Sequence, residues 1–258
     1  MRLFRRSAWA LPYSIFLMIF VVAPMIIVAL YAFGFREGHF TLQHFVKFCQ
    51  TPEDYRTFVY SIEIAIITTV FCLLIGYPAA WIMANSKLHR SKVTVLLFIL
   101  PMWINMLIRT LATVALFDFV HAPLGESALI FGMVYNFLPF MIYPIYNVLL
   151  KMDPSYSEAA QDLGASPWKV FWKVTVPLSF PGIMSGILMV FMPTISTFAV
   201  AELLTMNKIK LFGTTIQENI NSGMWNYGAA LAMIMLLIIG ITMLFSKEND
   251  ETEKGGLL

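Results

Sequence analysis

Charge is scarce in this sequence. Of its 258 residues only 12% are Asp, Glu, Lys or Arg, whereas 59% are hydrophobic and the mean hydropathy is +0.75. A soluble domain carries charge on about a quarter of its residues. The composition therefore excludes an ordinary soluble domain and indicates an integral membrane protein.

Residues that would supply enzyme or metal chemistry are also scarce. Cys72 lies in an apolar run and Cys49 in a polar one, so the two cysteines indicate neither a disulfide framework nor a metal site. No GxxxxGK[ST] motif occurs, which excludes ATP binding through a phosphate-binding loop of this chain. Since no nucleophile and base stand out as a pair, we expect no enzymatic activity, no resident cofactor and no nucleic-acid partner.

Long apolar runs dominate the sequence instead. A helix that crosses a bilayer needs about 20 mostly apolar residues. Six runs qualify: Trp9–Phe33, Phe58–Ala84, Val93–Phe119, Ser127–Leu150, Pro181–Leu204 and Tyr227–Phe245. Several contain proline, which membranes tolerate where neighbouring helices satisfy the freed carbonyl groups. We therefore predict an all-α bundle of six transmembrane helices.

The amino end is basic. Its sequence MRLFRR resembles the start of a signal peptide, but the apolar run that follows exceeds the usual ~7–15 residues. No small-x-small cleavage site follows either. We therefore interpret residues 1–33 as a cytoplasmic segment and a retained first helix.

Lysine and arginine are distributed unevenly between the two sets of connections. One set, with both chain ends, contains Arg2, Arg5, Arg6, Lys87, Arg90, Lys92, Lys151, Lys169, Lys173, Lys247 and Lys254. The other set contains only Arg36, Lys47, Arg56, Lys208 and Lys210. Because cytoplasmic segments carry the excess of Lys and Arg, we expect both termini in the cytoplasm.

This orientation divides the rest of the chain. We expect an external loop over 34–57, in which FTLQHFVKFCQ has the spacing of a short surface helix. A five-helix core follows over 58–246, with a cytoplasmic loop at 151–180 and a further external connection at 207–226. The tail at 247–258 is polar, and we expect it to be disordered.

The cytoplasmic loop has helix signals of its own. Asp153 before a proline is typical of a helix start, and Gly164 is typical of a helix end, so a first helix is predicted over Pro154–Leu163. Ser166 before a second proline predicts another helix, to about Val174. We expect Pro177 to stop it, because proline cannot continue the backbone hydrogen bonds.

The second predicted helix is amphipathic. Trp168, Phe171 and Trp172 form one stripe, and Lys169 and Lys173 form another beside it. Two interpretations fit this periodicity. The segment rests on lipid headgroups, or it docks on a cytoplasmic partner.

The residues of this loop also carry a resemblance. The pattern Glu-Ala-Ala, three residues, Gly, nine residues, Ile-x-Leu-Pro is typical of the permease subunits of binding-protein-dependent ABC importers. The similar residues here are Glu158, Ala159, Ala160, Gly164, Val174, Val176 and Pro177. Valine stands in place of the usual isoleucine and leucine, whereas the spacing, the glycine and the proline are intact.

The resemblance implies a type I ABC importer permease fold and a loop that couples to an ATPase. It implies the following coupling residues: Ser157, Glu158, Ala159, Ala160, Asp162, Leu163, Gly164 and Pro177. It also implies four kinds of partner in a bacterial inner membrane. These are a related second permease, a dimer of ATPase subunits that binds ATP and Mg, an external solute-binding protein and the lipid bilayer.

A closer resemblance concerns the transported solute. PMWINMLIRT at Pro101–Thr110, GMVYNFLPFMIYPIY at Gly132–Tyr146 and EAAQDLGAS resemble runs in spermidine/putrescine permeases, and the similarity extends from about Thr41 to Asn219. Permeases for iron, thiamine or phosphonates share some of these runs and remain alternatives. A secondary transporter or channel predicts repeats and half-helices, and it leaves the loop pattern unexplained.

Several polar and aromatic residues lie in the predicted spans. Carboxylates and aromatic faces attract the ammonium groups of a polyamine. The candidates for a substrate path are Trp103, Arg109, Asp118, Tyr135 and Glu202. The alternatives are aromatic packing, solvated helix ends and, for Arg109, a structural ion pair with Glu63 or an extended side chain that reaches the interface. We expect Asn105 and Asn136 to form hydrogen bonds between helices.

Overall fold

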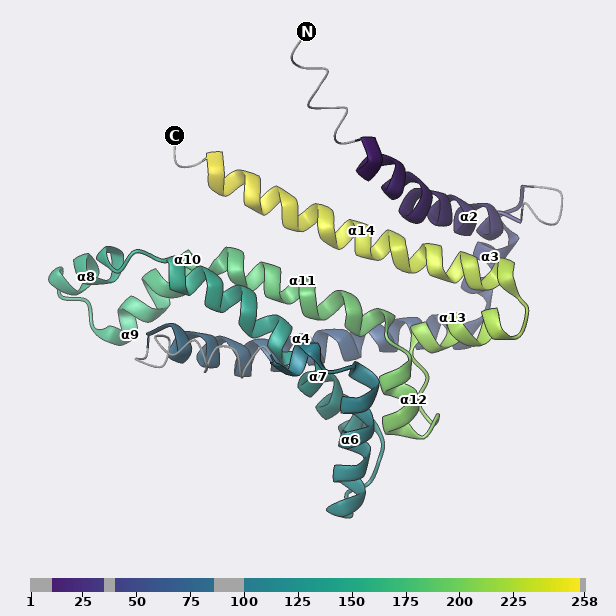
Figure 1. The fold of residues 1–258 in the computed structure, drawn as a ribbon, viewed down its shortest axis with the longest axis horizontal. Coiled ribbons are helices and arrows are strands. Elements are labelled where there is room, and N and C mark those ends of the chain that lie inside the picture. Colours follow the sequence, from purple (N-terminus) through teal and green to yellow (C-terminus); the bar gives the residue numbers. More distant parts are fainter. Residues whose placement is uncertain (1–10, 35–39, 86–99, 256–258) are drawn as a thin grey trace, which may run out of the picture. The chain divides into compact units, whose positions relative to one another are not determined.

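The computed structural model describes residues 11–34, 40–85 and 100–255, and all regular structure in these ranges is helical (Figure 1). The elements are η1 Met18–Val22, α2 Ala23–Ala32, α3 Gln43–Gln50, α4 Pro52–Asn85, α6 Met106–Phe119, α7 Glu126–Lys151, α8 Ser155–Asp162, α9 Pro167–Val170, η4 Phe171–Thr175, α10 Val176–Leu178, α11 Phe180–Ser196, α12 Ala199–Thr205, α13 Phe212–Asn221 and α14 Trp225–Gly255. The elements η1 and η4 are π-helical. The predicted all-α class is confirmed.

Four helical stretches in the described ranges are long and apolar enough to cross a membrane. They are Leu11–Ala32, Pro52–Asn85, Glu126–Lys151 and Trp225–Met243. A fifth candidate is the pair Pro167–Leu178 and Phe180–Ser196, which is bent by 63°. The first, second, fourth and sixth predicted runs therefore correspond to single helices.

The third and fifth predicted runs are not single helices where the structure describes them. The third starts among residues 86–99, outside the described ranges, and its later part is interrupted before α6, where the Asn105 side chain caps the helix. The fifth is divided at Thr197, whose extended backbone separates α11 from α12. Ser196 bonds back to the carbonyl of Met192, and such serine bonds weaken a helix near its end.

The ends of several segments in the structure also differ from the predicted ends. Helix α4 begins at Pro52 with two acids in its first turn, so the predicted loop 34–57 is shorter than expected. The connection at 207–226 contains α13. The tail, expected to be disordered, continues α14 as a helix to Gly255, which fits the high helix propensity of its Glu and Lys residues.

The described chain divides into two compact units. Residues of 57–214 with 241–258 form one, and residues of 1–56 with 215–240 form the other. In the smaller unit α3 confirms the predicted surface helix, and its Lys47 lies 4.3 Å from the ring centre of Tyr227. The hydroxyl of Tyr227 donates to Asp54, which fixes the start of α14 to the start of α4.

Helix α7 is the centre of the larger unit. Helices α6, α11 and α12 all contact it, and Met133, Met141 and Ile145 on it are fully buried. Gly182 and Gly186 of α11 form a Gly-x-x-x-Gly pair against α7. A Cβ on Gly182 would lie 3.1 Å from both the Pro144 carbonyl oxygen and the Ile145 Cα, so the two backbones are in close contact.

Candidate functional site

Helix α8 confirms the first predicted helix of the loop. The Asp153 carboxylate accepts a 2.9 Å hydrogen bond from the backbone N–H of Ser155. This backbone bond, and then the Ser155 hydroxyl, lower the pKa of the Asp153 carboxyl below its usual value. The cap therefore stabilises α8 above the ordinary Asp pKa of about 3.9, and the stabilisation is lost as the pH falls through the lowered pKa.

The end of α8 is a left-handed glycine turn. Gly164 has a φ of +80°, its N–H donates to the Gln161 carbonyl at 2.8 Å, and the N–H of Ala165 donates to that of Ala160 at 3.0 Å. These two bonds form a Schellman motif, which satisfies the last carbonyl groups of the helix. A Cβ at Gly164 would meet no atom within 4 Å, so the backbone angle alone requires glycine there.

The surface of α8 is open. None of its residues is buried, and Leu163, directly after it, is 90% exposed. Among the described elements, only α9 and η4 make substantial contacts with α8. The predicted coupling residues Ser157, Glu158, Ala159, Ala160, Asp162, Leu163 and Gly164 thus lie together on one short exposed segment.

The second predicted helix is longer than expected. It continues past Val174, and Pro177 does not stop it but lies in the first turn of α10. The π-turn explains this difference, since the N–H of Val176 bonds to Phe171, five residues back, rather than to the usual carbonyl. The chain bends only at Ser179, where φ is −89° and ψ is 0°.

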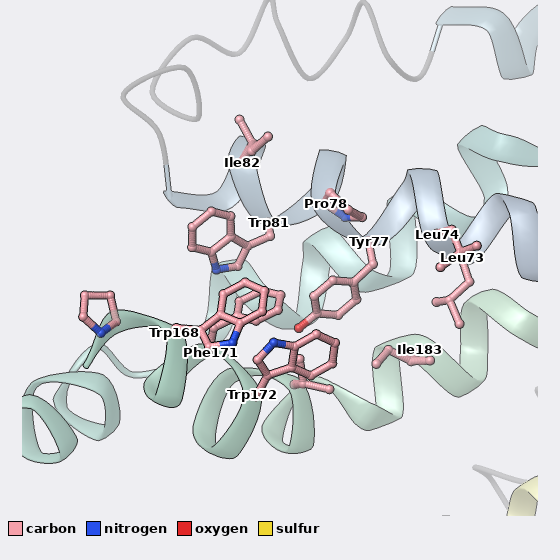
Figure 2. A pocket seen from close by; sticks show the side chains of 12 residues that line it. Leu73, Leu74, Tyr77, Pro78, Trp81, Ile82, Trp168, Phe171, Trp172 and Ile183 are labelled. Atoms are coloured by element: carbon pink, nitrogen blue, oxygen red, sulfur yellow. The ribbon is translucent and has the colours of Figure 1, made fainter. Parts of the chain in front are cut away.

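Aromatic residues attach this second helix to α4. The Phe171 ring lies 5.8 Å from Tyr77 and 5.5 Å from Trp81, both in edge contacts, and Trp168 and Trp172 complete the cluster (Figure 2). The Tyr77 hydroxyl is 2.9 Å from the hydroxyl of Ser179, and this bond is buried at the bend before α11. The second helix of the loop is therefore packed against α4, and the bend that leads into α11 is bonded to α4 as well.

Sequence reasoning did not find this anchor. Tyr77 and Ser179 are 102 positions apart, and neither belongs to a recognisable motif. The Gly-x-x-x-Gly pair at Gly182 and Gly186 was also missed, although its spacing is visible in the sequence and is a signal for helix contact.

Arg109 is buried in the larger unit, with 5% of its surface exposed. Its guanidinium carbon lies 5.9 Å from the ring centre of Tyr135, which makes a cation–π contact. Its Nε and Nη1 have no hydrogen-bond partner among the described residues. Neither the predicted ion pair with Glu63, which is exposed on α4, nor an extended side chain that reaches the interface is formed.

The two asparagines have different roles. Asn136 donates to the Thr110 hydroxyl at 3.2 Å and joins α7 to α6, which confirms its predicted hydrogen bond between helices. The prediction for Asn105 is wrong, because its side chain accepts from the Leu107 N–H at 2.8 Å and caps α6 within its own segment.

The other substrate-path candidates are spread over three segments. Trp103 is exposed just before α6, and Asp118 is exposed near the end of that helix. Glu202 is half-buried in the first turn of α12, which contacts both α6 and α7. Of the five candidates, the structure records a direct contact only between Arg109 and Tyr135.

Comparison with known proteins places this arrangement in a family. A family model described as "Binding-protein-dependent transport system inner membrane component" matches residues 73–247, which include α8, the aromatic anchor and α7. The chain belongs to this family. Together with its apolar helices, this makes it a multi-pass inner membrane protein of an ABC transport system.

Similar proteins of this family cover nearly the whole chain. The "Spermidine/putrescine transport system permease protein PotB" of Haemophilus influenzae is 36% identical over 94% of this chain and 91% of its own length. The protein of the same name from Escherichia coli is 32% identical over 88% and 91%. The resemblance to an importer permease, inferred above from the loop motif, is confirmed.

Solved ABC transporter structures share the fold. A chain of a bacterial transporter involved in import of the acidic polysaccharide alginate superposes with a TM-score of 0.71, at 18% identity and 96% coverage of both chains. A chain of the MetNI methionine ABC transporter, in an inward-facing conformation, gives 0.62 at 15% identity and covers 77% of this chain.

Proposed function

We propose that the chain is the permease subunit of an ATP-driven importer for polyamines of the spermidine and putrescine class. The observation that carries this proposal is the 32–36% identity to spermidine/putrescine permeases over about nine tenths of the chain. The chain forms half of the translocation path, and ATP hydrolysis belongs to a separate ATPase subunit that binds ATP and Mg.

Membership of this family supports a proposal for the full assembly. A related second permease completes the path, two ATPase subunits dock on the cytoplasmic face, and an external solute-binding protein delivers the substrate. We propose the type I fold for this chain, with six transmembrane helices and both termini in the cytoplasm. The uneven distribution of Lys and Arg supports this orientation.

Helix α8 is the proposed coupling helix, which docks in a groove of the ATPase. Its open surface, with Glu158, Ala159 and Leu163 exposed, leaves room for such a partner. ATP binding closes the ATPase dimer and moves α8. The motion passes to α9 and η4, and from them through Phe171 to α4 and through Ser179 to α11.

The energetic requirement on this coupling is definite. Nucleotide must favour one conformer over the other, and a change from 1:99 to 99:1 needs about 5.5 kcal/mol of differential binding. A loose loop would dissipate part of this free energy in its own motion. The Asp153 cap, the Gly164 turn and the aromatic anchor each reduce that freedom.

The class of solute can be tested by uptake. A strain that lacks this gene should lose uptake of labelled spermidine or putrescine, while uptake of iron and thiamine continues, and the gene on a plasmid should restore it. Loss of only a non-polyamine uptake would make the chain a permease for that other solute. A secondary transporter would continue uptake after its ATPase partner is removed.

Glu202 supplies a more local prediction. It is half-buried on α12, beside the helices that carry Arg109 and Tyr135, and we expect its carboxylate to attract an ammonium group of the substrate. Glu202→Gln should raise the polyamine concentration for half-maximal uptake by about tenfold, because the substrate loses one charge-assisted hydrogen bond. The measurement is the uptake rate against concentration in intact cells.

Glu53→Gln is the matched control for this test. It removes the same charge from an exposed site in the first turn of α4, a helix that carries none of the five substrate-path candidates. If both variants leave the half-saturating concentration unchanged, Glu202 is a solvated helix end and has no part in substrate binding.

A further inference from the structure

An apolar groove lies between α4 and the α9–α11 segment of the larger unit (Figure 2). It has a volume of about 620 Å³, within the range of sites that hold small molecules. Its lining consists of Leu73, Leu74, Tyr77, Pro78, Trp81, Ile82, Pro167, Trp168, Phe171, Trp172, Val176 and Ile183. The only side-chain polar atoms in this set are a tyrosine hydroxyl and indole N–H groups.

The outer part of the groove is open to the surroundings. Trp168 is 70% exposed and Trp172 is 53% exposed, and Leu74 and Ile82 on the facing helix are exposed as well. In a bilayer, apolar surfaces that no other protein covers meet hydrocarbon. Tryptophan and tyrosine prefer the boundary between hydrocarbon and headgroups, so the aromatic cluster marks the end of the groove nearest to the headgroups.

Two lysines lie next to these tryptophans in the sequence of the helix, outside the groove lining itself. Lys169 and Lys173 follow Trp168 and Trp172 directly in the helix, four positions apart, and both are exposed. In the described part of the chain neither lysine forms an ion pair, not even with the acids of neighbouring α8. Their two positive charges are therefore available to an anionic group outside the chain.

From this arrangement we propose that the groove binds an anionic phospholipid of the surrounding bilayer. Its phosphate-bearing headgroup lies at Lys169 and Lys173, and one acyl chain lies over Leu74, Trp81 and Trp172. The lysines match the anionic headgroup of such a molecule, and the apolar groove matches its acyl chain. Paired lysines at an apolar, tryptophan-lined groove provide for a lipid headgroup what isolated surface lysines do not.

The proposed lipid lies on the segment that connects α8 to α4 and α11. It lies along the contact between the Phe171 cluster and α4, and it thereby stiffens the contact through which loop motion passes. This inference goes beyond the proposed transport function. It does not depend on which solute is carried.

Photo-crosslinking tests the proposal directly. The assembled importer is placed in nanodiscs that contain either phosphatidylglycerol or phosphatidylcholine with a photoactivatable acyl chain, and the labelled peptides are mapped by mass spectrometry. We expect phosphatidylglycerol to label residues 73–82 and 167–183. We expect its preference over phosphatidylcholine to be about tenfold or more, since each lysine near the headgroups attracts an anionic lipid.

Matched lysine variants separate charge from position. The double variant Lys169→Gln with Lys173→Gln should abolish the preference for phosphatidylglycerol, whereas Lys169→Arg with Lys173→Arg should keep it. Lys151→Gln with Lys208→Gln removes the same charge from exposed sites in segments that do not line the groove, and it should also keep the preference. All four positions are exposed lysines, so folding is not at risk.

Three results would overturn the proposal. Equal labelling by both lipids would mean that the lysines select no headgroup. Labelling spread evenly over the membrane-facing helices would mean that the groove holds no particular lipid. A cross-link from residues 73–82 to the second permease, in place of lipid, would mean that the groove is a subunit interface.

Discussion

Replacing Gly164 with proline should abolish transport while the importer still assembles and hydrolyses ATP. The turn after α8 needs a φ of +80° and an N–H that donates to Gln161 at 2.8 Å. Proline provides neither, because its φ is fixed near −65° and it has no N–H. The end of α8 would therefore change direction, and motion of the ATPase would no longer reach η4. The measurement is substrate uptake beside ATPase activity in reconstituted vesicles.

Gly164→Ala should reduce transport less than Gly164→Pro does. A Cβ at this position meets nothing within 4 Å, so the substitution changes only the backbone preference. A left-handed alanine costs about 1–2 kcal/mol, which reduces the population of the native turn by about tenfold. We expect intermediate uptake per ATP hydrolysed.

Gly223 offers a matched control for the proline variant. It also has a φ of +80° and ends α13 through the same pair of bonds, from Gly223 to Ile220 and from Met224 to Asn219. By the proposed orientation this turn is external. Gly223→Pro should disturb its own turn as strongly but leave hydrolysis coupled to transport. Normal uptake by the Gly164→Pro variant would contradict the coupling role of α8.

Gly182→Leu should greatly reduce the amount of folded permease. A Cβ there would lie 3.1 Å from backbone atoms of both Pro144 and Ile145 of α7, and a backbone cannot rotate away as a side chain can. Overpacking a core costs about 1–3 kcal/mol, and separation of two helix backbones lies at the upper end or beyond. About 3 kcal/mol corresponds to a shift of over a hundredfold between folded and unfolded protein.

The amount of monodisperse protein extracted from the membrane, with its thermal midpoint in detergent, measures this effect. Gly240→Leu is the control, because it makes the same change in an apolar membrane helix where a Cβ meets nothing within 4 Å. If Gly182→Leu behaves as Gly240→Leu does, α7 and α11 do not depend on the close contact of their backbones.

Local signals in the sequence located both ends of helix α8. Asp153 and Gly164 act at the two ends of α8, as expected from the hydrogen-bonding needs of helix ends. The same reasoning failed at Pro177, where a π-turn accommodates the proline, and at Asn105, which caps α6. Both bonds are local, but both residues lie in or next to apolar runs in which an uninterrupted α-helical geometry was assumed.

Hydropathy was less able to define continuous helices. The run Pro181–Leu204 is mostly apolar, yet Thr197 divides it, and Gly213 explains why the divided form packs. A Cβ on Gly213 would lie 2.5 Å from the Ser196 carbonyl oxygen, so a segment 17 positions further along the chain lies directly against the break. Breaks of this kind are stabilised by distant parts of the chain.

The sequence by itself determined that the chain belongs in a lipid bilayer and that it is helical. It also determined the loop motif and the family resemblance. All of these depend on composition and on residues close together in the chain. Only the tertiary structure decided that Arg109 meets Tyr135 rather than Glu63, and that Phe171 meets Tyr77 and Trp81. Only the structure also showed that the helix that carries Lys169 and Lys173 forms an apolar groove with α4. The physical reason is that these contacts join helices far apart in sequence, and close packing selects among partners that the sequence leaves equally available.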